Sequence, residues 1–131
     1  MNTVTKTKEN PIGYKTEEEL ISDVSQATPH RLVQMLYQGA LKRIIIAKDA
    51  IDNNDYETRD KTIDRIISII KSLDESLNYK DGGEIAKGLH LVYHQSILLL
   101  LEAQQYNTSS LLEEPFEILA QMNDSWNNIN K

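Results

Sequence analysis

Residues 28–51, TPHRLVQMLYQGALKRIIIAKDAI, carry the clearest helix signals in this chain. Thr28 is a favourable N-cap, and Pro29 suits the first helical position because a backbone N–H would have no helical partner there. In the residues that follow, apolar side chains cover roughly two-thirds of the helix circumference, whereas a surface helix needs only one apolar stripe. The pattern predicts a helix from residue 28 to about 53 that is too apolar to be covered along one face alone.

The length and composition indicate a single domain. A chain of 131 residues is long enough to bury a core without metal or disulfide support. It has no cysteine, which excludes a disulfide framework and a thiol nucleophile. Residues 1–10 lack the apolar core of a signal peptide, and no apolar run approaches the roughly 20 residues of a membrane span. We therefore expect a cytoplasmic protein that is not inserted in a membrane.

The charge argues against nucleic acid as the main partner. The formal net charge is −6 and the isoelectric point is about 5.0. Proteins that bind a phosphate backbone need clustered Lys and Arg, and here the basic residues are dispersed among acidic ones. No nucleic-acid partner is expected.

The remaining sequence also has helical periodicity and no alternating strand pattern. We predict an all-α fold, an antiparallel up-down four-helix bundle with an additional short N-terminal helix or arm. Residues 1–13 are expected to form a flexible arm, and residues 14–131 the bundle domain, in which 14–24 is a short helix or an extended segment. The long helices are expected at about 28–53, 57–77, 83–106 (starting at Asp81 or Gly83) and 110–128, with Pro115 delaying or kinking the last one.

The helix at 83–106 is also too apolar for a simple bundle. Its expected core stripe consists of Leu89, Tyr93, Ile97 and Leu100. Leu91, Leu98 and Leu101 fall on or beside the opposite face, among charged and polar residues. Two explanations remain open: the apolar helices sit centrally, with the 14–24 segment covering a groove, or they form a grooved surface for an amphipathic partner. Both can hold.

Several short motifs resemble the flagellin export chaperones, the FliS family. Tyr14-Lys15 precedes Thr28-Pro29, which is followed by LVQMLYQGA at residues 32–40. Further on, SLDESLNYKDGGEIAKGLHLVYHQSILLLLEA at residues 72–103 carries the family's Ser-Leu-Asp and Gly-Gly-Glu-Ile-Ala, and Trp126 has a family counterpart near the end. The resemblance extends over about residues 10–130.

The resemblance implies a cytoplasmic chaperone that binds the disordered C-terminal segment of flagellin, which folds into helices against apolar grooves and is kept from polymerising before export. The resemblance also leaves open that the flagellar export gate recognises the loaded complex. We predict that the free protein is a monomer or weak homodimer, that Tyr14 docks into part of the groove, and that no cofactor or metal is bound. The predicted partner-binding residues are Tyr14, Leu41, Ile44, Ile45, Ile51, Leu91, Leu98 and Leu101.

Other functions have less support from the residues. A di-metal helical-bundle enzyme needs Glu-x-x-His pairs, which do not occur, and there is no nucleophile elbow or phosphate-binding loop. His90 and His94 have the spacing of half a zinc site without a third ligand, so a solvated or partly buried pair is the expected state. Arg43 is expected to pair with a carboxylate or to contact a partner. A helical adaptor that dimerises through the same apolar faces is the alternative function.

Overall fold

The computed structural model describes residues 17–129, and the described part of the chain is entirely helical apart from its connections. The predicted arm and Tyr14 lie outside the described residues. The elements are α2 (Glu17–Gln26), α3 (Pro29–Asp52), α4 (Tyr56–Glu75), α5 (Tyr79–Tyr106), the 3₁₀ helix η1 (Ser109–Leu112) and α6 (Glu113–Asn127). The all-α prediction is thus confirmed, and the segment left open as helix or extended chain contains a helix, α2.

The start of α3 and the turn after it follow the sequence signals. The Thr28 hydroxyl accepts a hydrogen bond from the Arg31 backbone N–H at 3.1 Å, as expected of an N-cap. After α3 ends, Asn54 adopts a left-handed conformation with φ of 57°, a conformation that Asn tolerates better than most residues. Asp55 then caps α4 by accepting from the Thr58 N–H at 3.2 Å.

The beginning of α5 differs from the sequence prediction. The helix begins at Tyr79, because the Asn78 side chain caps it by accepting from the Asp81 N–H at 3.1 Å. The backbone then leaves helical geometry at Gly83, where φ is 50° and ψ is −122°. A positive φ is accessible to glycine because it has no Cβ. The expected start at Asp81 or Gly83 therefore corresponds to a kink, preceded by one helical turn.

Pro115 delays the last helix, as predicted. Residues 109–112 form η1, and α6 begins at Glu113, so that Pro115 lies in the first helical turn. The missing N–H of proline does no harm there, since first-turn donors have no partner within the helix. Pro115 is itself buried between the elements.

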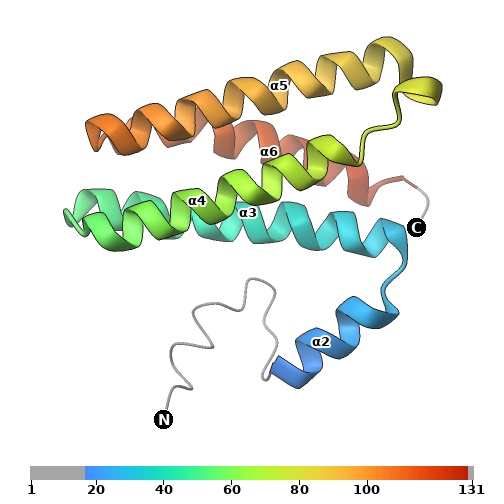
Figure 1. The fold of residues 1–131 in the computed structure, drawn as a ribbon, viewed down its shortest axis with the longest axis horizontal. Coiled ribbons are helices and arrows are strands. Elements are labelled where there is room, and N and C mark those ends of the chain that lie inside the picture. Colours follow the sequence, from blue (N-terminus) through green and yellow to red (C-terminus); the bar gives the residue numbers. More distant parts are fainter. Residues whose placement is uncertain (1–16, 130–131) are drawn as a thin grey trace.

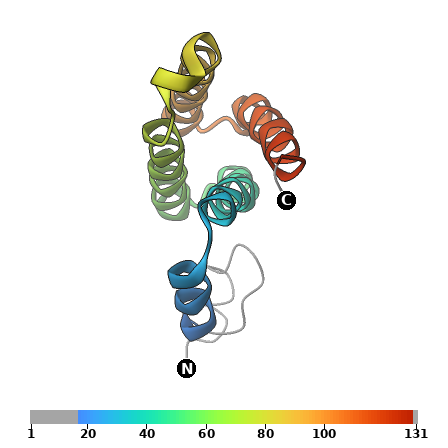
Figure 2. The ribbon, with the colours of Figure 1, turned by 90° about the vertical axis from the view of Figure 1, so that its right-hand side faces the viewer.

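The four longer helices of the described chain lie side by side, whereas α2 projects away from them (Figures 1 and 2). Helix α3 packs against α4 and α6, and α5 packs against α4, η1 and α6. The core contains one face of α4, on which Ile63, Ile66, Ile70 and Leu73 are almost fully buried. Tyr93 and Leu100 of α5 are also buried, which confirms the predicted core face of that helix.

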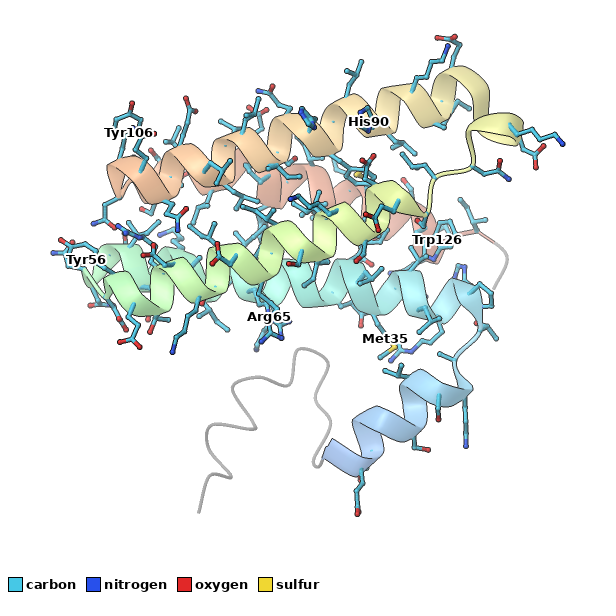
Figure 3. All side chains as sticks on the ribbon, viewed as in Figure 1. Met35, Tyr56, Arg65, His90, Tyr106 and Trp126 are labelled. Carbon is cyan, nitrogen blue, oxygen red and sulfur yellow. The ribbon has the colours of Figure 1, made fainter. Side chains whose placement is uncertain are left out.

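Two polar contacts tie distant parts of the chain together. In the core, the hydroxyl groups of Tyr37 on α3 and Tyr93 on α5 are 2.7 Å apart. Burial raises the pKa of both tyrosines. At the end of α6, the Trp126 indole N–H donates to the His30 carbonyl at 2.9 Å, and the two rings stack with centroids 4.9 Å apart. The last turn of α6 is thereby held against the first turn of α3 (Figure 3).

Candidate partner-binding surface

The outer leucine ridge of α5 consists of Leu91, Leu98 and Leu101, whose side chains are 68%, 53% and 43% exposed. The opposite face of the same helix carries buried Tyr93, Ser96 and Leu100, so the ridge points away from the core. Clustered exposed leucines on one helix face are unfavourable in water, and such patches commonly mark interaction sites. The ridge therefore provides apolar surface that no described part of the chain covers.

Polar contacts hold α5 against α4 and thereby fix the position of the ridge on the outer face of α5. His90 Nδ1 lies 2.7 Å from an oxygen of Asp74, and the Gln104 amide donates to Asp60 at 2.9 Å. Asp60 also accepts from Arg59 at 2.9 Å, and these hydrogen bonds, that of Arg59 foremost, lower the pKa of the Asp60 carboxyl. The ridge is consequently presented on a helix fixed at several points along its length.

The predicted residues of α3 are divided between the core and the surface. Ile44 and Ile51 are buried in the core, at 2% and 4% exposure, and Leu41 is partly buried against it. Ile45 is 56% exposed. Much of the apolar width of α3 is accounted for by its position between α4 and α6, as the central placement in the first explanation predicts. The described part of the 14–24 segment, in α2, projects away from the other helices, so the groove cover in that explanation is not seen there. Partner contact by these residues remains a prediction.

A hollow between α3, η1 and α6, here called the α3–α6 cavity, has a volume of about 310 Å³. Ile44, Ile45, Leu112 and Phe116 provide its apolar walls, and the other lining residues are Lys48, Ser109, Glu113 and Glu117. The two isoleucines are among the partner-binding residues predicted from the sequence, whereas the lining residues of η1 and α6 are not. The spacing of Leu112 and Phe116 places them on the apolar side of the last helix, but it does not indicate that this side faces α3.

The residues considered for other chemistry have mainly structural contacts. Arg43 is partly buried and donates to the Gly39 carbonyl at 3.3 Å within its own helix. The rings of His90 and His94 lie 5.7 Å apart, and His90 is engaged with Asp74. Among the described residues, no group of three or more potential ligands could hold a metal ion. None of the helices in this part of the chain has the length and apolarity needed to cross a bilayer.

Comparison with known proteins identifies the family. Residues 13–131 match the family described as "Flagellar protein FliS". The flagellar secretion chaperone FliSB of Pseudomonas aeruginosa is 37% identical over 108 residues, which is 82% of this chain and 86% of that protein. The flagellar secretion chaperone FliS of Vibrio cholerae is 32% identical, over 82% of this chain and 79% of that protein. The flagellar secretion chaperone FliS of Bacillus subtilis is 30% identical, over 80% of this chain and 77% of that protein.

These relatives are named as chaperones and not as enzymes. The match to the family covers nearly the whole chain, including all of the helices described above. It also includes α5 with its leucine ridge and the elements that line the α3–α6 cavity. The chain belongs to the FliS family of flagellar proteins.

Proposed function

We propose that this protein is a cytoplasmic export chaperone that binds the disordered C-terminal segment of flagellin in apolar grooves of an antiparallel four-helix bundle. Binding would prevent premature polymerisation and aid delivery to the flagellar type III export apparatus. The observation that carries the proposal is the outer leucine ridge of α5, which is exposed on a well-packed helix. The names of the relatives support a flagellar cargo.

The physics of coupled folding favours such a surface. A disordered segment must be ordered when it binds, at a cost of about 2–5 kcal/mol or more. Long apolar strips can offset that cost, because each Å² of apolar area removed from water contributes roughly 25 cal/mol. The net affinity stays moderate, so the segment can still be released for export.

The proposed contacts fall into two sets. Leu91, Leu98 and Leu101 form the first set, on α5. The second set, on α3, consists of the exposed Ile45, the partly buried Leu41 and the cavity-lining Ile44. Ile51 is buried in the core and would contribute by supporting this surface. Tyr14 is proposed to dock into part of the groove in the free protein.

Light scattering on a size-exclusion column tests the proposal. The protein alone, of 15.0 kDa, is mixed with the C-terminal segment of flagellin from its own organism. We expect a one-to-one complex whose mass is the sum of the two chains. Separate elution of protein and segment at every concentration would contradict the proposed function.

The alternative function, a dimerising helical adaptor, is supported by the same exposed leucine ridge. If the ridge pairs with the ridge of a second copy, the mass of the protein alone should double with rising concentration. Variants that replace ridge leucines by Glu should then be monomeric. A mass that stays at 15.0 kDa over the whole range argues against this alternative.

A further inference from the structure

We propose that the α3–α6 cavity receives one bulky apolar side chain of the bound segment, and that a residue next to this side chain in the segment is basic and is held by Glu113 and Glu117. The identity of the segment as flagellin rests on the proposed function. The expected side chains of the segment, one apolar and one basic, are inferred only from the residues around the cavity.

The walls and the size of the cavity suit a large apolar side chain. Ile44 and Ile45 of α3 face Leu112 and Phe116 across the hollow. Its volume of about 310 Å³ is at the lower end of the roughly 300–1,000 Å³ typical of ligand pockets. The hollow is open to solvent on one side, so an apolar side chain that projects from a segment bound along α3 and α6 can enter it and contact Ile45 and Phe116.

The charge around the cavity favours a basic neighbour. Glu113 and Glu117 are four residues apart on α6, both line the cavity and both are exposed. Within residues 17–129, no salt bridge involves either of them. The one cation that lines the cavity, Lys48, has its ammonium 3.2 Å from Asp52, which offsets its charge. The local excess is therefore negative.

The helix dipole does not fully explain these acids. A negative charge in the first turn stabilises a helix, and Glu113 lies in that turn of α6. Glu117 lies one turn further on, where the effect of the helix terminus has faded. Its carboxylate is therefore available to a basic residue of a segment bound at the cavity.

The same charges disfavour a second copy of this chain as the occupant. In a symmetric dimer centred on the cavity, each surface would meet its own equivalent. Glu113 and Glu117 of one copy would then approach the same carboxylates of the other. Like charges at close range cost free energy, whereas a basic segment would gain it.

A methyl NMR titration with three small peptides tests the chemistry of the anchor directly. The probes are N-acetyl-Phe-Lys amide, N-acetyl-Phe-Glu amide and N-acetyl-Ala-Lys amide, added to the full chain with labelled isoleucine methyl groups. We expect the Phe-Lys probe to shift the methyl signals of Ile44 and Ile45, and to bind at least about tenfold more tightly than either other probe. The double variant Glu113→Gln/Glu117→Gln should bind both Phe probes equally.

Two results would overturn the inference. One is equal binding of the Phe-Lys and Phe-Glu probes to the unaltered chain, which would mean that the acids do not select the neighbour. The other is the absence of shifts at Ile44 and Ile45. Since neither result involves flagellin, this titration decides the inference even if the proposed function is wrong.

The second arm of the experiment uses the flagellin segment. At low salt, Glu113→Gln/Glu117→Gln should weaken its binding by about three- to tenfold and reduce the salt dependence. The control Glu114→Gln/Asp124→Asn removes two charges from exposed positions of α6 that do not line the cavity, and should leave binding unchanged. Equal effects of the two double variants would overturn the inference, whereas failure of the unaltered chain to bind the segment would contradict the proposed function.

Discussion

The outer leucine ridge of α5 and the α3–α6 cavity are both apolar, but they arise in different ways. The ridge is one face of a single helix, and its leucines contribute little to the core. The cavity is assembled from three elements, and two of its walls, Ile44 and Leu112, are core residues at 2% and 1% exposure. The ridge should therefore be open to mutation without loss of the fold, whereas the cavity should not.

Substitutions in the cavity and in the ridge should differ most in how far they lower the free energy of unfolding. Leu112→Ala should lower the free energy of unfolding by about 2–5 kcal/mol, because it removes a buried side chain and leaves a void. Leu98→Ala should change it by no more than about 0.5 kcal/mol, since the side chain is already half exposed. Urea denaturation followed by circular dichroism measures both. Comparable losses for the two variants would mean that the ridge belongs to the core.

The next effect concerns binding by the ridge. The double variant Leu98→Glu/Leu101→Glu should weaken binding of the flagellin segment at least thirtyfold, or about 2 kcal/mol, because charged side chains replace apolar anchors. Circular dichroism should show a retained fold. The control Gln95→Glu/Gln105→Glu adds the same charges to exposed positions of α5 without removing a leucine. If the control weakens binding as much, electrostatic repulsion and not the ridge is responsible.

A smaller effect probes the connection between the helices that carry the two regions. Tyr37→Phe removes one hydroxyl of the buried pair joining α3 to α5 and leaves the Tyr93 hydroxyl without this partner. We expect a loss of about 1–2 kcal/mol in the free energy of unfolding. The double variant Tyr37→Phe/Tyr93→Phe should lose less than the sum of the single variants. Strict additivity in a double-mutant cycle would contradict a direct interaction.

The same pair predicts a pH dependence on the alkaline side. Burial raises the pKa of both tyrosines above the ordinary 10.0, so the folded state retains protons that the unfolded state releases. The stabilisation is fully present below about pH 10 and is lost as the pH rises further. Urea denaturation should show a steeper decline above that pH for the unaltered protein than for Tyr37→Phe/Tyr93→Phe. Parallel curves would exclude the pair as the cause.

The smallest effect concerns the attachment of α5 to α4. Asp60 is about half exposed and accepts from Arg59 and Gln104, which lower its pKa. Its contribution is present at neutral pH and is lost as the pH falls and the carboxyl is protonated. Asp60→Asn should therefore cost no more than about 1 kcal/mol at neutral pH, and less in acid. A cost that grows as the pH falls would have the wrong sign for this interaction.

Most of the fold could be predicted because helical periodicity and capping are local properties. Thr28 and Asp55 act as N-caps where the sequence has typical capping residues, and the isoleucines of α4 face the core as their spacing indicates. The start of α5 could not be predicted, because the cap at Asn78 and the kink at Gly83 use a combination of helix and turn signals within six residues. Local patterns do not show which signal prevails.

The candidate site could be predicted only in part, because the ridge lies on a single helix whereas the cavity is assembled from three elements. The exposure of Leu91, Leu98 and Leu101 follows from their position on one helix. For α3, the same reasoning could not separate exposed Ile45 from buried Ile44, because their burial depends on where α6 packs. Phe116 and Glu117 complete the cavity through contacts between distant segments, which no local pattern encodes.

A calorimetric titration of the unaltered protein with the C-terminal flagellin segment, at several temperatures, measures whether the two apolar regions bind this segment. We predict one-to-one binding with a strongly negative heat-capacity change, because apolar surface is buried when a disordered segment folds onto the ridge and the cavity. One-to-one binding with a heat-capacity change near zero would contradict burial of the apolar surfaces. The absence of heat at every temperature, together with separate elution of the two chains, would contradict flagellin as the partner.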